Sequence, residues 1–160
     1  MDMNLPQNRI SKRALPVWRL TGILRSLVYW VIVIVGSVFV IIKDFSKWWI
    51  IGSGVVVLMI TALLTLIIPR VRWERWRYEV REQEIEFQYG LFIVTRTLVP
   101  MVRVQHVDTV QGPILRKYGL ATLMISTAAT VHEIPAIDMY EADELRKSIS
   151  TLARVAEDDV

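Results

Sequence analysis

The sequence predicts a two-helix transmembrane hairpin followed by a small antiparallel β domain that a C-terminal α-helix caps. Three observations support this fold class: two long uncharged apolar stretches, a change to alternating hydrophobicity near residue 78, and an amphipathic segment close to the C-terminus. Apolar residues make up 53% of the 160-residue chain, and the excess lies in the two stretches. This composition is too apolar for a single soluble domain of that length.

The two apolar stretches predict a helical hairpin over residues 23–68, with spans at about 23–42 and 48–68. An α-helix of about 21 residues is roughly 31 Å long, which matches the hydrocarbon core of a bilayer. Only residues 43–47 separate the spans, so the spans must be antiparallel. No small-residue cleavage site follows the first span, which favours an anchor over a cleaved signal peptide.

Basic residues flank the predicted hairpin on one side. Residues 1–22 form a basic N-terminal segment, and residues 69–77 form a basic and aromatic juxtamembrane linker with four arginines against one glutamate. The positive-inside rule places both flanks in the cytoplasm. All six tryptophans lie at or just beyond the ends of the apolar stretches, where amphipathic rings are favoured. We therefore expect a multi-pass protein of the cell membrane with both termini cytoplasmic.

A β hairpin is expected at the start of the domain. Ile85, Phe87 and Tyr89 alternate with charged and amide side chains, which predicts a strand with one buried face. Gly90 permits a tight turn into a return strand at 91–99.

The rest of the domain, which we place at 78–156, contains more strands and two helical segments. A strand is expected around Val104, a helical turn at 114–118, and further strands at 121–127 and 130–134, the last closed by Pro135. Asp138 and Glu141 fit a capping box at the start of the final helix. The apolar stripe of that helix is Ala142, Leu145, Ile149, Leu152 and Ala156. These elements predict a small barrel or curled sheet with the helix packed on it.

Five short motifs follow one another through this domain. They are Tyr89-Gly90-Leu91, Val104-Gln105-His106-Val107, Gln111-Gly112-Pro113, Tyr118-Gly119-Leu120-Ala121-Thr122-Leu123 and Glu141-Ala142-Asp143-Glu144-Leu145. Their order and spacing resemble the bacterial pleckstrin-homology-like (PH-like) domain of the second type, and the two preceding spans make the chain similar to the YdbS-like membrane protein family. The resemblance implies a PH-like, strongly bent antiparallel β-barrel or sheet of seven strands, capped by one C-terminal α-helix.

The resemblance also implies a partner. Proteins of this family frequently accompany a larger membrane protein that carries several copies of the same domain, and they have been associated with protection against membrane-active antimicrobial peptides. Open sheet edges can accept a strand from a neighbouring chain. We therefore expect a noncatalytic, membrane-anchored interaction module that acts as an accessory subunit of such a complex or assembles into a homo-oligomer.

The juxtamembrane linker suggests an alternative function. Cations and aromatic residues alternate in it: Arg70, Arg72, Trp73, Arg75, Trp76 and Arg77. Such clusters attract anionic lipid headgroups by about 1 kcal/mol per basic residue near the surface. The same cluster is also expected as a topology signal after any inward-directed span. The alternative is thus an anionic-lipid-sensing domain at the membrane surface.

Charge argues against nucleic-acid partners. Residues 82–160 carry twelve acidic against seven basic residues, and the basic segments lie beside the membrane. A nucleic-acid interface needs a basic patch that the bilayer does not occupy. The same acidic surface disfavours a phosphoinositide pocket in the distal domain.

Enzyme chemistry lacks the residues that it requires. The chain has no cysteine, and His132-Glu133 begins like a zinc-protease motif but has Ala136 where the second histidine is needed. A metal site would have to combine His106 and His132 with carboxylates from elsewhere. Ser53 lies between two glycines, yet neither span offers a histidine or lysine as its base, so we interpret the glycines as helix-packing residues. We expect no catalytic residues, no metal and no cofactor.

Overall fold

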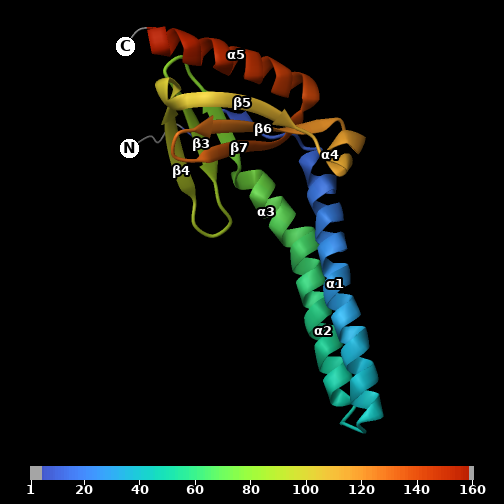
Figure 1. Cartoon of the computed structure of the whole chain (residues 1–160). Helices are drawn as coiled ribbons and strands as arrows, with labels where there is room; N and C mark the ends of the chain where they lie inside the picture. The colour runs from blue at the N-terminus through green and yellow to red at the C-terminus, as the bar shows by residue number, and fades with distance from the viewer. Residues whose placement is uncertain (1–4, 159–160) are drawn as a thin grey trace. The chain divides into compact units, whose positions relative to one another are not determined.

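The computed structural model describes residues 5–158 and divides the chain into two compact units. One unit is Leu15–Val71, and the other combines the segment that ends at Ala14 with the residues from Arg72 onward. Figure 1 shows the helices and strands of both units, most of them labelled. The helical hairpin is therefore inserted into the sequence of the β domain, and the N-terminal segment belongs to that domain.

Two long helical stretches form the hairpin unit. The first is α1 (Ala14–Ile42); the second joins α2 (Trp48–Ala62), the π-helix η1 (Leu63–Ile67) and α3 (Ile68–Arg75). Both stretches are long and apolar enough to span a membrane. α1 begins well before residue 23, and Pro16 does not interrupt it because the first turn of a helix needs no backbone N–H partner.

A close approach between α1 and η1 fixes the packing of the hairpin. A Cβ atom at Gly22 would lie 2.5 Å from the carbonyl oxygen of Leu64, so only glycine allows the two backbones to come this near. Two turns along α1, the indole N–H of Trp30 donates to the hydroxyl of Thr61 at 3.2 Å. The hairpin therefore combines one close backbone contact with one half-buried hydrogen bond between side chains.

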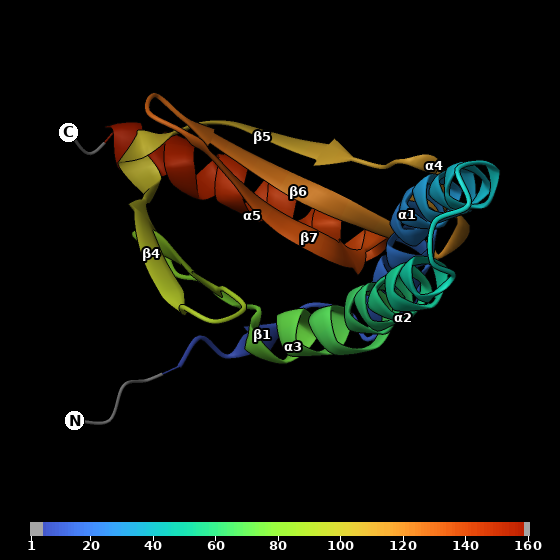
Figure 2. The ribbon, with the colours of Figure 1, turned by 90° about the horizontal axis from the view of Figure 1, so that it is seen from below.

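Seven strands in the described residues form two antiparallel sheets (Figure 2). The four-stranded sheet has the order β1–β2–β3–β4 and the three-stranded sheet the order β5–β6–β7. The strands are β1 (Asn8–Arg9), β2 (Arg77–Val80), β3 (Glu84–Tyr89), β4 (Thr95–Pro100), β5 (Val104–Val110), β6 (Leu120–Thr127) and β7 (Val131–Asp138). The predicted PH-like fold is confirmed, although the sheets do not close into a barrel.

The β hairpin at the start of the domain has a longer loop than predicted. Tyr89 and Thr95 form the last pair between β3 and β4, so β4 does not begin at residue 91. Gly90 has a positive φ of 137°, and a Cβ atom there would lie 1.9 Å from the carbonyl oxygen of Ile93. Only glycine can open this loop, because other residues would clash with the loop's own backbone.

The prediction that Pro135 closes the last strand is wrong, because β7 continues to Asp138. β7 is an edge strand, so the missing N–H of proline costs no ladder hydrogen bond on its open side. Ala136 next to it has a positive φ of 52°, and the pairing with β6 shifts at this point. Pro135 and Ala136 therefore form a β-bulge, which carries the strand onward.

The C-terminal helix α5 (Met139–Asp158) begins where the sequence predicts, after the short helix α4 (Pro113–Lys117) and β7. The Asp138 carboxylate accepts a hydrogen bond from the backbone N–H of Tyr140 at 3.2 Å, which is an N-cap contact. Glu141 does not reach back to this cap and instead accepts a hydrogen bond from the hydroxyl of Tyr78.

The core of the β domain lies where α5 and the inner faces of both sheets meet. The apolar side chains with the least exposure come from all three layers: Tyr78, Ile85, Phe87, Met101, Leu120, Leu123, Ile125, Ile134, Ile137, Ala142 and Ile149. Ala142 and Ile149 belong to the predicted apolar stripe of α5, whose burial stabilises the helix on the sheets. This core holds the loops and sheet edges of the domain in place.

The hairpin contact predicts that alanine destabilises the fold at one glycine of α1 and not at another. Gly22→Ala should weaken the folded hairpin by about 1–3 kcal/mol, the usual cost of overpacking, because its Cβ would overlap the Leu64 carbonyl. Gly36→Ala is the matched control, since a Cβ there would meet no heavy atom within 4 Å. Unfolding of the purified chain in mixed micelles, followed by circular dichroism, measures both. Equal stability of the two variants would contradict the proposed role of Gly22.

Candidate functional site

The six juxtamembrane residues do not form one patch. Arg70, Arg72, Trp73 and Arg75 belong to α3, Trp76 follows it, and Arg77 is the first residue of β2. Arg72 lies 3.9 Å from the Glu133 carboxylate on β7 in an exposed ion pair, which contributes little to stability. The residues from Arg72 to Arg77 contact different segments of the β domain, as follows.

Trp73 holds the N-terminal segment. Its indole N–H donates to the carbonyl oxygen of Ile10 at 3.2 Å, and the guanidinium of Arg9 lies 6.0 Å from its ring centroid in a cation–π arrangement. These contacts lie beside the pairing of β1 with β2, in which Arg9 stands opposite Arg77. Trp73 thus helps to fix a strand that precedes the membrane hairpin to one that follows it.

Trp76 and Arg75 hold the β3–β4 hairpin. The Trp76 side chain is only 4% exposed, and its ring stacks on Tyr89 with the centroids 6.3 Å apart. The Arg75 guanidinium donates hydrogen bonds to the carbonyl oxygens of Leu91 at 2.5 Å and Phe92 at 3.4 Å. Trp76 therefore contacts protein in the domain core, and Arg75 sets the position of the loop after β3.

A row of basic side chains crosses the outer face of the four-stranded sheet. The register places Arg9 opposite Arg77, Arg77 opposite Gln88, and Gln88 opposite Arg96. Arg9 and Arg77 have no acidic partner among the described residues. Because like charges on directly opposite residues are unfavourable, this pair is a candidate site for an anion.

The polar face of β3 is buried, contrary to the prediction that only its apolar face is. Glu86 and Gln88 are each 7% exposed. Glu86 accepts hydrogen bonds from Arg96 and Arg81, whose side chains compensate the burial of its charge. The Oε1 atom of Gln88 is buried without a hydrogen-bond partner among the described residues. This amide stands opposite Arg77, so a buried acceptor and a cation, each without a partner among the described residues, are neighbours in the row.

The longest open edge of the four-stranded sheet is β4. It pairs with β3 on one side only, whereas β1 at the other edge has just two residues. A hollow of about 500 Å³ lies beside β4, and the turn between β6 and β7 forms its opposite wall. Residues of the wall include Thr97, Leu98, Val102, Ala128 and Thr130. Leu98 is 51% exposed at this edge.

Two ionisable groups of the core have structural roles. Tyr78 is buried and donates to Glu141, so desolvation first and the hydrogen bond second raise the pKa of the Tyr78 phenol above its ordinary value. His132 stacks on Phe87 with the rings 5.3 Å apart, and burial lowers the pKa of His132. His106 lies on β5, with β6 between it and β7. The described residues contain no cluster of three or more His, Cys, Asp or Glu that can hold a metal ion.

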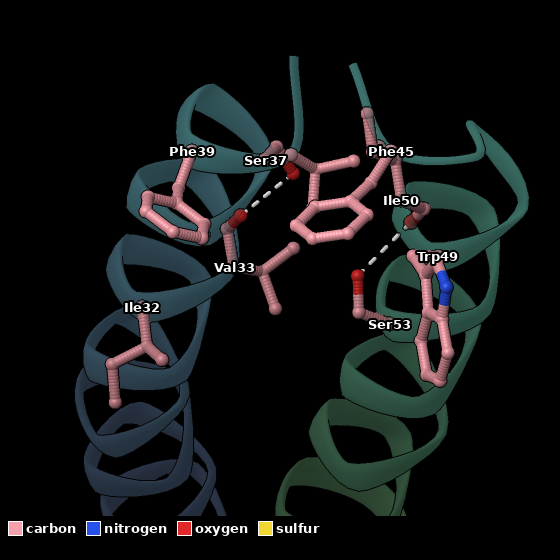
Figure 3. Close-up of a pocket in the computed structure, with 10 residues that line it drawn as sticks. Ile32, Val33, Ser37, Phe39, Phe45, Trp49, Ile50 and Ser53 are labelled. Carbon is pink, nitrogen blue, oxygen red and sulfur yellow. Dashed lines mark hydrogen bonds between the residues drawn. The ribbon is translucent and has the colours of Figure 1, made fainter. Parts of the chain in front are cut away.

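An apolar cleft of about 530 Å³ separates α1 from α2 near the loop that joins them (Figure 3). The Ser37 hydroxyl donates to the Val33 carbonyl oxygen at 2.7 Å and the Ser53 hydroxyl to that of Ile50 at 3.1 Å, so both serines bond to their own helices. A Cβ atom at either glycine beside Ser53 would meet no heavy atom within 4 Å. The interpretation of these glycines as packing residues is wrong within this hairpin, because the close helix contact lies at Gly22.

Comparison with known proteins agrees with this architecture. The model of the family described as Bacterial PH domain matches residues 23–153, which include most of the hairpin and nearly all of the β domain. The chain belongs to this family. The match begins at residue 23 and therefore does not include β1. In this chain β1 completes the four-stranded sheet of the domain.

Two curated relatives extend the assignment. The chain is 56% identical over 158 residues to the UPF0699 transmembrane protein YdbS of Bacillus subtilis (strain 168), which covers 97% of this chain and 98% of that protein. It is 23% identical over 100 residues to the UPF0699 transmembrane protein YdbT of the same strain, which covers 60% of this chain and 20% of that protein. No solved structure matches the chain. It is thus a membrane-associated bacterial PH domain protein of the UPF0699 family.

Proposed function

We propose that this chain is a noncatalytic, membrane-anchored interaction module, and that it acts as an accessory subunit of a complex with a larger membrane protein that carries similar domains. The observation that carries the proposal is the open edge of β4 with the hollow beside it. An edge strand offers unpaired backbone N–H and C=O groups to a strand of a partner. The membrane helices raise the effective concentration of a membrane-bound partner, so a small contact suffices.

The similarity to YdbT supports a larger partner. A segment similar to 60% of this chain makes up only a fifth of YdbT, and both YdbT and YdbS come from the same strain. A two-fold symmetric interface uses the same surface on both partners, and two domains of the same fold can pair in a similar way through their equivalent edges. A second copy of this chain can use the same edge, which would produce a homo-oligomer.

Leu98→Lys should abolish the proposed contact. Lysine on an edge strand blocks the addition of a further strand, and at this position it stands opposite Glu86, which favours normal folding. Val110→Lys on β5 is the matched control, because Val110 is also 51% exposed. Crosslinking in native membranes, followed by mass spectrometry, should recover a stoichiometric membrane partner with the unmodified chain and with Val110→Lys only.

The same pair of variants tests the biological setting that we propose, which is envelope defence. Cells that carry Leu98→Lys should become as sensitive to a membrane-active antimicrobial peptide as cells without the protein, and Val110→Lys should protect fully. In the crosslinking experiment, recovery of monomer alone from the unmodified chain and from both variants would exclude the proposed complex. Unchanged peptide sensitivity after deletion would exclude the defence role and leave the complex standing.

We also propose, as a second candidate function, that the domain senses anionic lipids. The observation in its favour is the pair Arg9 and Arg77, two opposite cations without an acidic partner among the described residues. They lie beside Trp73, which belongs to the juxtamembrane cluster. An anionic headgroup between them would relieve their repulsion, and a hydroxyl group of the same headgroup can donate to the buried Oε1 of Gln88.

Arg77→Gln should weaken this lipid contact. Loss of one basic residue near the membrane removes about 1 kcal/mol, which is roughly a fivefold drop in occupancy. The control is Arg103→Gln, because Arg103 is exposed and lies on η2 (Met101–Arg103), away from the basic row. Native mass spectrometry of the full chain, released from nanodiscs of mixed neutral and anionic lipid, counts the lipids retained. Equal retention by both variants would exclude the site.

Both proposals place the β domain in the cytoplasm, with the protein in the cell membrane and both termini inside. The support is the basic character of both flanks of the hairpin. Because the chain has no cysteine, single thiols report the topology. A membrane-impermeant maleimide applied to intact cells should label Ser46→Cys in the loop between the spans, and should label Ser148→Cys on α5 only after permeabilisation. The reverse pattern would place the domain outside.

A further inference from the structure

The loop between β3 and β4 exposes an apolar tip. Phe92 is 97% exposed, Ile93 82% and Val94 45%. Figure 1 shows this loop extending past the ends of both strands, where no other segment of the β domain covers it. Adjacent apolar side chains with this much exposure on a soluble surface are unfavourable and indicate an interaction surface.

The tip is held in place by the domain. Gly90 supplies the positive φ that opens the loop, and the stacked rings of Trp76 and Tyr89 fix its base. The Arg75 guanidinium donates to the carbonyl oxygens of Leu91 and Phe92. These hydrogen bonds matter in an apolar environment, because a carbonyl group that enters lipid without a partner costs several kcal/mol.

The chain ties this loop to the membrane. Arg75 is the last residue of α3, which continues the second membrane-spanning stretch without a break. From Ile68, where the predicted span ends, Arg75 lies seven residues onward, or about 10 Å along a helix. The headgroup layer of a bilayer is about 5–7 Å deep on each side. A loop that Arg75 contacts directly is therefore within reach of the lipid surface.

Basic residues lie directly behind the tip. The pair Tyr89 and Thr95 closes the loop, and the next row of the sheet contains Arg77, Gln88 and Arg96. An apolar tip with cations at its base suits the anionic surface of a membrane, where the side chains enter the hydrocarbon boundary and the cations stay among the headgroups.

We infer that the loop Gly90–Val94 inserts Phe92 and Ile93 into the bilayer, and that it is a membrane attachment of the β domain in addition to the two helices. The loop shares no residue with the β4 edge, so a protein partner can bind at the same time. The attachment restricts the motion of the β domain on the membrane, because it adds a second point of contact beside the one through α3.

Depth measurement with single spin labels tests the inference on the full chain in nanodiscs that contain anionic lipid. The chain has no cysteine, so Phe92→Cys and Ile93→Cys carry the only labels. Both positions are highly exposed, and either probe therefore leaves the core intact. Ser148→Cys on α5 is the control for a site in water.

The expected result is a reversal of accessibility. Labels at 92 and 93 should collide more often with oxygen, which concentrates in lipid, than with a water-soluble nickel chelate, and the label at 148 should show the opposite. Nickel accessibility at 92 and 93 equal to that at 148 would overturn the inference. Protection of both loop labels from both reagents would also overturn it, because protein contact and not lipid would then cover the tip.

Discussion

The pairing of β1 with β2 is the constraint on which the rest of the structure depends. Asn8 and Arg9 precede the membrane hairpin, and their partners Tyr78 and Arg77 follow it. The segments that flank the hairpin in the sequence are thereby joined in one sheet, so the first span must begin and the second span must end on the same side of a membrane. Trp73 reinforces the join by bonding to Ile10. The β domain is thus assembled from segments that lie before and after the hairpin in the sequence.

The junction between α3 and β2 explains why the six juxtamembrane residues have different roles. The helix α3 ends at Arg75 and the strand β2 starts at Arg77, so the side-chain period changes from about 3.6 to 2 within three residues. Neighbours in sequence consequently point in different directions: Trp76 enters the core, Arg75 contacts the loop after β3, and Arg77 joins the outer face. Only part of the cluster is left facing away from protein, where an anion can reach it.

Features with a local cause could be predicted from the sequence, and those with a tertiary cause could not. The spans follow from hydropathy, and the start of α5 from the capping residue Asp138. β1 has only two residues, which is too few to show a periodic pattern in the sequence. It forms a strand because it pairs with β2. Pro135 does not end its strand because β7 is an edge strand, where a proline is tolerated. The sequence does not show the strand order and therefore does not show this edge position. The sequence does contain one signal that Trp76 faces the core. Trp76 lies two residues before Tyr78, so in an extended chain both side chains point to the same face.

Because the β domain is anchored by two helices, its small surfaces need less binding free energy to hold a partner in the membrane. Association from solution must overcome the loss of translational and rotational freedom, whereas two helices in a bilayer have already removed most of that freedom. An apolar tip of two or three side chains and one open edge strand would then be sufficient for the contacts that we propose. β4 begins directly after the loop at Thr95, so a strand added along β4 would have one end at the lipid surface whenever the loop is inserted. That geometry favours a partner that is itself a membrane protein, because only such a partner presents a strand at this level without an extra tether.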